Sequence, residues 1–208
     1  MPCNHKFKRH IELSQLDFEP TTLIVGTFNP EWPASNTAEW FYGRTAKNNF
    51  WDVLPRLYGM PSLITAGPVE WKQFCKEQKI ALSDLISCVD DADEHNKEHQ
   101  KIIGGFSDEA LAFNFDDIEF VPIVQLLKKH PTIKNVYLTR GISEAYWRHL
   151  WNPVIHYCSL NGLRERRLLT PSGNAFYQHG AHNNDHPDDP IPLLEDYILR
   201  RWQQEWHF

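Results

Sequence analysis

The stretch Thr22-Leu23-Ile24-Val25-Gly26-Thr27-Phe28, which runs directly into Asn29-Pro30, decides the fold. Apolar and often β-branched residues that end at a proline-stiffened loop are typical of a strand buried in a parallel sheet. Ligands bind such sheets outside the carboxyl ends of the strands. Asn29 would stand at that edge on a rigid support, as an oriented amide requires. The alternative is that the Asn-Pro pair only closes the strand with a turn.

Helical and strand patterns alternate along the rest of the chain. Helices are expected at 48–57, 69–79, 120–130, 143–150 and 191–206, and further strands at 80–86, 135–139 and 166–170. Asn48 and Ser143 are expected to cap two of these helices. Strands separated by helices indicate a parallel sheet covered on both faces. We therefore expect a single domain over 1–208, with a three-layer α/β/α fold around a mostly parallel four-stranded sheet.

The acidic residues are concentrated in one part of the chain. The whole sequence has 21 Lys and Arg against 27 Asp and Glu, a net charge of −6, which argues mildly against a nucleic-acid partner. Residues 84–119, most of which are expected to form an acidic loop, hold eleven carboxylates and only two lysines. The remainder is therefore weakly basic and compatible with a phosphate backbone.

The cysteines and the N-terminal residues argue against several classes of protein. The four cysteines are far apart and form no C-x-x-C pair, so we expect no zinc site, no iron–sulfur cluster and no cofactor. No apolar run follows the basic residues of 1–9, so neither a signal peptide nor a membrane span is expected. Free thiols without an export signal favour an intracellular, cytoplasmic location.

Two further segments carry candidate binding residues. Phe41 and Tyr42 stand before the helix expected at 48–57, and Lys47 and Asn48 lie at its N-terminus. Aromatic rings suit base stacking, and a helix N-terminus favours anions such as phosphate. Covering the core is an equally good interpretation of the two aromatic residues.

The second of these segments follows the last expected strand and reads Thr170-Pro171-Ser172-Gly173-Asn174-Ala175-Phe176-Tyr177. Its Pro-Ser-Gly turn exposes a hydroxyl and backbone N–H groups, which can hold a phosphate. On its own this is a common loop composition.

Taken together, four motifs resemble those of the uracil-DNA glycosylase superfamily, and most closely its mismatch-specific uracil and hypoxanthine branch. The family motif G-I-N-P-G is matched by Thr27-Phe28-Asn29-Pro30, H-P-x-N-x-F-W by Thr45-Ala46-Lys47-Asn48-Asn49-Phe50-Trp51, I-x-L-x-D-V-x-x-S-C by Ile80 to Cys88, and N-P-S-G-L-S by Thr170 to Ala175. The order and spacing agree over residues 21–178, which is most of the chain.

The resemblance implies a monomeric DNA glycosylase that hydrolyses the bond between sugar and base in DNA with a flipped deaminated or mismatched base. Asn29 matches the residue that positions the attacking water. Backbone N–H groups of Gly26, Thr27 and Phe28 would stabilise the departing base, and Tyr42, or else Phe41, would stack on it. The remaining matches are Asn48 in the middle motif, Thr139 and Arg140 at the base edge, Pro171, Ser172, Gly173, Asn174 and Lys47 as phosphate contacts, and Phe176 and Tyr177 as a wedge in the duplex.

The sequence departs from the family at three places. Thr139-Arg140-Gly141 stands where the family commonly has an asparagine that reads the base edge. Thr45-Ala46 replaces His-Pro, and Glu31 replaces the last glycine of the first motif. These changes leave the identity of the excised base open.

Two other functions compete with the glycosylase interpretation. The segment from His179 to Asp189 collects histidines and carboxylates that could bind a divalent metal, as in a metal-dependent hydrolase. Their irregular spacing, interrupted by Gly180 and Pro187, favours a solvated loop without a metal site. The other alternative is a module that binds nucleic acid or a nucleotide without cleaving it.

Overall fold

The computed structural model describes residues 1–208 and has a central sheet of four parallel strands. In spatial order the strands are β3 (Ile80–Asp84), β2 (Thr22–Gly26), β6 (Asn135–Leu138) and β7 (Arg164–Arg167). All three pairings are parallel, and Thr22 is level with both Ile80 and Asn135. The carboxyl ends of the strands therefore meet at one edge, as the alternation of helices and strands predicted.

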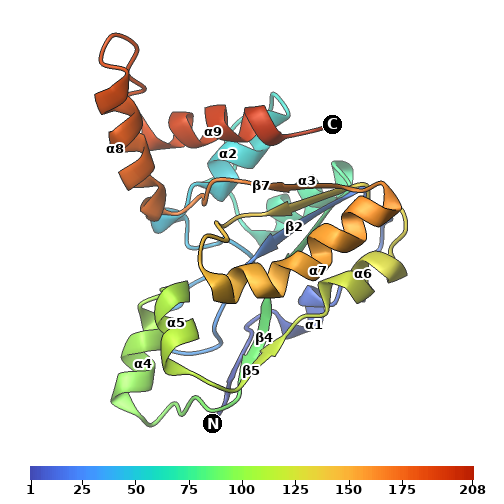
Figure 1. Cartoon of the computed structure of the whole chain (residues 1–208), viewed down its shortest axis with the longest axis vertical. Helices are drawn as coiled ribbons and strands as arrows, with labels where there is room; N and C mark the ends of the chain where they lie inside the picture. The colour runs from blue at the N-terminus through green and yellow to red at the C-terminus, as the bar shows by residue number, and fades with distance from the viewer.

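Helices cover both faces of this sheet (Figure 1). One face carries α6 (Ile123–Lys129) and α7 (Ala145–Asn161), which pack against each other. The other carries α2 (Phe50–Leu57), α3 (Pro68–Glu77) and α9 (Leu194–Glu205). The three-layer α/β/α fold expected from the sequence is confirmed.

Stacked aromatic side chains join the layers. Trp51 of α2 lies parallel to Trp71 of α3, with ring centroids 5.0 Å apart, and Tyr137 of β6 stacks on Trp206 at 4.4 Å. Large flat rings bury much apolar area with little loss of side-chain freedom. Much of the aromatic content of the sequence therefore serves packing.

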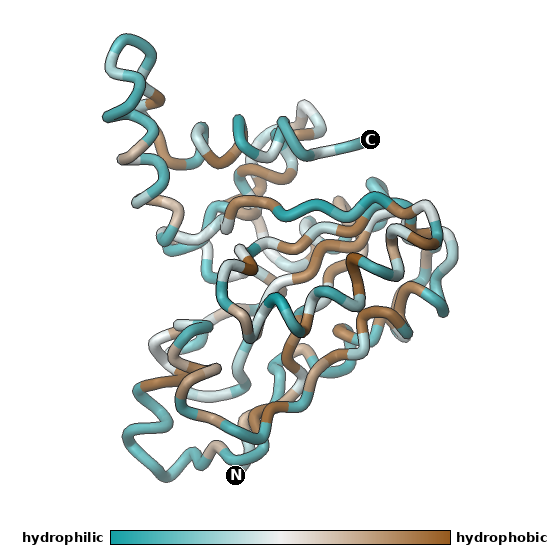
Figure 2. Tube along the Cα trace, viewed as in Figure 1, coloured by the Kyte–Doolittle hydropathy of each residue, from teal (hydrophilic) through white to brown (hydrophobic).

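The strands of the sheet differ sharply in polarity. Leu23, Ile24 and Val25 of β2 are fully buried at the centre, whereas β7 reads Arg-Glu-Arg-Arg and is mostly exposed. Figure 2 shows this contrast as brown inner strands beside a teal outer one. Charged side chains on an edge strand discourage pairing with other chains.

The acidic part of the chain is more structured than expected. Residues 90–117, here called the acidic excursion, contain α4 (Lys97–Gly104) and α5 (Asp108–Asn114). The side chains of Asn96 and Ser107 cap these helices by accepting bonds from backbone N–H groups. The expectation of an acidic loop was therefore wrong, because two N-cap signals within the charged run were overlooked.

A second, antiparallel sheet frames the excursion. It consists of β1 (Cys3–Asn4), β4 (Ile86–Val89) and β5 (Ile118–Phe120), in the order β1-β4-β5. β4 follows β3 after the single residue Leu85, so the chain passes directly from one sheet to the other. The helix expected at 120–130 therefore begins only at Ile123.

Several boundaries differ from the sequence expectations. The helix expected at 143–150 runs from Ala145 to Asn161 and includes Pro153, and Ser143 lies outside its N-cap, which is Glu144. The last strand lies earlier than expected, at Arg164–Arg167. Short helices complete the fold: α1 (Lys8–Ile11), η1 (Thr45–Lys47), η2 (Gly173–Ala175) and α8 (Phe176–Asp185). None of the helices has the length and apolar character needed to cross a bilayer.

Candidate functional site

A cavity of about 800 Å³ opens at the carboxyl edge of the central sheet. The loops that follow β2, β6 and β7 all contribute to its wall, together with Asp84 at the end of β3 and the start of α5. Its size lies within the usual range for a small-molecule site. Asn29 and Ser172 line this one cavity, although 143 positions separate them in the sequence.

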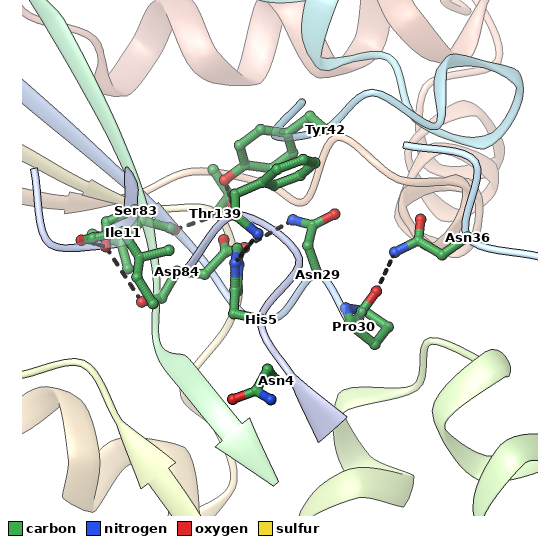
Figure 3. Close-up of polar contacts among 12 residues, drawn as sticks. Asn4, His5, Ile11, Asn29, Pro30, Asn36, Tyr42, Ser83, Asp84 and Thr139 are labelled. Atoms are coloured by element: carbon green, nitrogen blue, oxygen red, sulfur yellow. Dashed lines mark hydrogen bonds and ion pairs between the residues drawn. The ribbon is translucent and has the colours of Figure 1, made fainter. Parts of the chain in front are cut away.

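Asn29 is held by a buried carboxylate. Its amide nitrogen Nδ2 donates to Oδ2 of Asp84 at 2.8 Å, and Nε2 of His5 contacts the same oxygen at 2.7 Å (Figure 3). The side chain of Asp84 is only 2% exposed and that of His5 is fully buried. A buried carboxylate needs such donors, because its removal from water is otherwise costly.

A backbone N–H group fixes the direction of the His5 bond, and the Asp84 carboxylate fixes that of the Asn29 bond. The N–H of Phe7 donates to Nδ1 of His5 at 2.9 Å, so Nδ1 is an acceptor and the ring proton resides on Nε2. Nε2 then donates to Asp84. Because that carboxylate accepts from the amino end of Asn29, the amide oxygen Oδ1 must point the other way (Figure 3). The first loop thus presents an oriented hydrogen-bond acceptor.

Gly26 is required by the close approach of this carboxylate. A Cβ atom at position 26 would lie 2.2 Å from Oδ1 of Asp84 and 2.8 Å from the hydroxyl of Tyr42. Both distances are shorter than real side-chain contacts. The glycine therefore lets the end of β2, the end of β3 and Tyr42 converge.

Tyr42 and Phe41, the two candidates for stacking on the base, lie in different environments. Tyr42 lines the cavity, where its ring stacks on Phe50 with centroids 3.8 Å apart and an interplanar angle of 4°. Its hydroxyl lies 2.9 Å from Oγ1 of Thr139, and burial raises its pKa, which keeps the phenol neutral. Phe41 is fully buried and packs against Phe7 and His5, away from the cavity wall. Of the two interpretations of Phe41, the structure supports the one in which it belongs to the core.

Thr139 and Arg140 both line the cavity, and most of their polar atoms already have partners. Oγ1 of Thr139 contacts the Tyr42 hydroxyl and, at 3.3 Å, the carbonyl oxygen of Val25. The guanidinium group of Arg140 lies 3.7 Å from the centre of the Trp147 ring and donates to Oδ2 of Asp108 at 2.8 Å. The hydroxyl of Thr27 donates to the same oxygen, also at 2.8 Å.

The last motif forms the rim of the cavity. Ser172 pairs with Asn48 through an isolated β-bridge, and the N–H of Asn49 donates to the Pro171 carbonyl at 2.7 Å. The middle and last motifs are thereby joined. Pro171, Ser172, Asn174 and Asn48 line the cavity, as do Gly26, Thr27 and Phe28.

Other predicted DNA contacts lie outside the cavity. Lys47 and Gly173 are exposed beyond its lining. Phe176 and Tyr177, at the start of α8, are 63% and 81% exposed. Large exposed aromatic side chains side by side are unusual on a protein surface unless they meet a partner.

Sequence reasoning missed several residues of the site. Asp84 belonged to a recognised motif but was not selected, and His5, Asp108, Arg167 and Arg201 were not considered. Arg167 and Arg201 line the cavity on the side of Ser172, from the end of β7 and from α9. A polar residue at the end of a parallel strand, as Asp84 and Arg167 are, was the available signal.

The histidine-rich segment from His179 to Asp189 is helical up to Asp185, and only its last residues form the expected loop. His179, on α8, is buried and its Nε2 lies 2.6 Å from the carbonyl oxygen of Ile191. His182 and His186 pack against each other with ring centroids 4.5 Å apart. No group of three or more His, Cys, Asp or Glu side chains is arranged to hold a metal ion. The four cysteines are free and buried, and burial raises the pKa of Cys3 to about 11.

Comparison with known proteins identifies the class of fold. No protein-family model and no curated protein matches the sequence. A solution NMR structure from Methanosarcina acetivorans, described as a "putative Uracil DNA glycosylase", matches with a TM-score of 0.51 and 16% sequence identity, covering 92% of this chain and 94% of that one. The chain therefore has a fold like that of this protein over nearly its whole length. At this level of identity the match concerns the fold alone.

Proposed function

We propose that this protein is a DNA glycosylase that hydrolyses the N-glycosidic bond of a base flipped out of the helix. The observation that carries the proposal is the placement of the oriented Asn29 amide and the Ser172 turn around one cavity. The deaminated bases uracil and hypoxanthine, or a mismatched base, are the substrates that the sequence motifs favour. A monomer acting on DNA, without a cofactor, is the form in which we expect it to work.

The chemistry would be concentrated at Asn29. Its amide oxygen would accept a hydrogen bond from water and aim the water oxygen at C1′ of the sugar. As the bond from C1′ to the base breaks, its electron pair leaves with the base and the sugar becomes cationic. The buried carboxylate of Asp84 lies behind Asn29 and would stabilise that positive charge. Water then bonds to C1′ and releases its proton to solvent.

The walls of the cavity would hold the base and its flanking phosphates. The Gly26–Phe28 segment lines the cavity, and its backbone N–H groups would stabilise negative charge on the departing base, while Tyr42 offers an aromatic wall. Ser172, Asn174, Arg167 and Arg201 form a polar and basic rim suited to phosphate. Phe176 and Tyr177 project beyond this rim and would fill the gap left in the duplex.

The decisive experiment is an excision assay with oligonucleotides that carry uracil, hypoxanthine or a G·T mismatch. The native protein should convert at least one of them to an abasic product. Asn29→Ala should lower the single-turnover rate by about 10²-fold or more, because a positioned group is lost at the reacting atom. Asn184→Ala, which removes an exposed amide on α8, is the matched control and should change nothing.

Three outcomes would count against the proposal or a part of it. Undiminished excision by Asn29→Ala would remove Asn29 from the mechanism. Tight binding of the oligonucleotides without any abasic product would identify a binding module of the same fold. Excision that required added divalent metal would point instead to metal-dependent hydrolysis.

A further inference from the structure

The residues expected to read the edge of the base have little hydrogen-bonding capacity left. The hydroxyl of Thr139 lies between the Tyr42 hydroxyl and the Val25 carbonyl. Arg140 donates through Nη1 to Asp108 and through Nε to the Gly141 carbonyl at 3.1 Å, and one face of its guanidinium group covers Trp147. Only 11% of the Arg140 side chain is exposed. A neighbouring group with an unoccupied acceptor is therefore better placed to distinguish one base from another at this wall.

Asp108 has the free capacity that these residues lack. It is the first residue of α5, and its side chain lines the cavity with 35% of its surface exposed. Both of its hydrogen bonds, from Thr27 and from Arg140, reach the same oxygen, Oδ2. Oδ1 accepts none. The carboxylate is therefore fixed in direction by two donors and keeps one oxygen available at the cavity wall.

We propose that Asp108 reads the flipped base, and that its free oxygen selects a base that presents an N–H donor to it. This inference rests on the proposed glycosylase function and names a feature of its substrate. Uracil carries such a donor at N3 and hypoxanthine at N1. Their parents, cytosine and adenine, have an acceptor nitrogen at the same ring positions, and a carboxylate oxygen facing that nitrogen would be repelled.

The surroundings of Asp108 suit this role. Arg140 supplies a fixed positive charge, so an ionised carboxylate can remain in the wall. Thr27 belongs to the first loop, two residues before Asn29, and its bond to Asp108 joins the base-reading wall to the water-positioning loop. The Thr27 hydroxyl would therefore fix the position of a base bound to Asp108 relative to Asn29.

The substitution Asp108→Asn gives a sharp test because its geometry is constrained. Thr27 and Arg140 donate to one oxygen, and the guanidinium group cannot act as an acceptor. The amide oxygen of the D108N side chain must therefore take the place of Oδ2, and its NH₂ group would take the place of Oδ1. The wall would change from an acceptor to a donor with almost no change of shape.

The experiment compares each base with its N-methylated counterpart, uracil with 3-methyluracil and hypoxanthine with 1-methylhypoxanthine, in single-stranded oligonucleotides. The native protein should excise the unmethylated base faster, and D108N should reduce that ratio about tenfold or more, the usual effect of one hydrogen bond to a charged group. D108N should also gain activity on cytosine or adenine. Asp117→Asn, on an exposed aspartate of the same excursion, is the control for charge and should leave the ratio unchanged.

The outcomes separate this inference from the proposed function. Excision by the native protein with the same ratio in D108N would overturn the role of Asp108 and leave the glycosylase proposal standing. If no base is excised, the same oligonucleotide pairs are compared in a binding assay. Equal binding of methylated and unmethylated bases by the native protein would then overturn the role of Asp108 as well. A melting curve of each variant checks that the Arg140 contact has not been lost through unfolding.

Discussion

The two sides of the cavity are built in opposite ways. On the side of Asn29, Asp84 and His5 are bonded to each other and are almost completely shielded from water. On the side of Ser172, two arginines from β7 and α9 line the cavity, and exposed aromatic residues lie beyond its rim. A rigid, dry side suits the positioning of reacting atoms, and an open, basic side suits contact with a large charged partner. Under the proposed function, the first side would carry out the chemistry and the second would bind the DNA.

The largest effect on excision is expected from a substitution of Gly26, where the Asp84 carboxylate approaches the end of β2 closely. Gly26→Ala would place a methyl group 2.2 Å from Oδ1 of Asp84, so the carboxylate would have to move and Asn29 with it. Excision should fall below detection, and the free energy of unfolding should drop by about 1–3 kcal/mol through overpacking. Activity and thermal melting measure the two effects. Gly180→Ala, where a methyl group meets nothing within 4 Å, is the control.

Two substitutions of Asp84 should separate its charge from its role in orientation. Asp84→Ala removes both, and the single-turnover rate should fall about 10²-fold or more with little change in KM. Asp84→Asn keeps an oxygen that can accept from His5 and Asn29, so it should lose less. Equal losses in the two variants would mean that the charge alone matters and that the orientation of Asn29 does not depend on this carboxylate.

The pH dependence of base selection should report on Asp108. Burial raises the pKa of this carboxyl, opposed by Arg140 and by the Thr27 hydroxyl, while the negative charges of Asp84 and Glu144 add to the rise. As the pH is lowered from neutrality through that pKa, the carboxyl gains a proton and Oδ1 can become a donor. The preference for an N–H base over its methylated counterpart should therefore decline in acid. In Asp108→Asn the low ratio should not change with pH over the same range.

The smallest effects on the free energy of unfolding are expected from Phe176 and Tyr177, on the side of Ser172. Phe176→Ala and Tyr177→Ala should change the free energy of unfolding by no more than about 0.5 kcal/mol, because both side chains are exposed. Excision from duplex DNA should nevertheless fall about tenfold, since the cost of unstacking is no longer offset. Excision from single strands should stay nearly constant. Leu160→Ala, at a similarly exposed apolar residue, is the control.

The rigid side was only partly predictable from the sequence. The run from Thr22 to Phe28 is mostly apolar and directly indicated a buried strand with Asn29 near its end. His5 gave no such signal, because its partner Asp84 lies 79 positions away and only the folded chain brings the two together. Asp108 was hidden among ten other carboxylates of the acidic stretch. Its importance depends on Thr27 and Arg140, which no local pattern connects with it.

The edge of the sheet was harder to predict than its centre. β7 consists of charged residues and its strand character comes from pairing with β6, so the sequence placed the strand two residues too late. The caps of α4 and α5, by contrast, are local signals that could have been used. Strands defined by tertiary pairing are the elements that a single sequence specifies least well.

The bonding of the N-terminal strand has a practical consequence. The N–H of Lys6 donates to the backbone carbonyl of Asn29 at 2.7 Å, and the N–H of Glu31 donates to the carbonyl of Asn4 at 2.8 Å. These contacts clamp the Asn29 loop from outside, next to the ring of His5. A protein that lacks residues 1–6 would lose these contacts but keep the central sheet. An N-terminal affinity tag that displaces β1 would have the same effect. Fusion partners are therefore better attached after Phe208, which is 80% exposed.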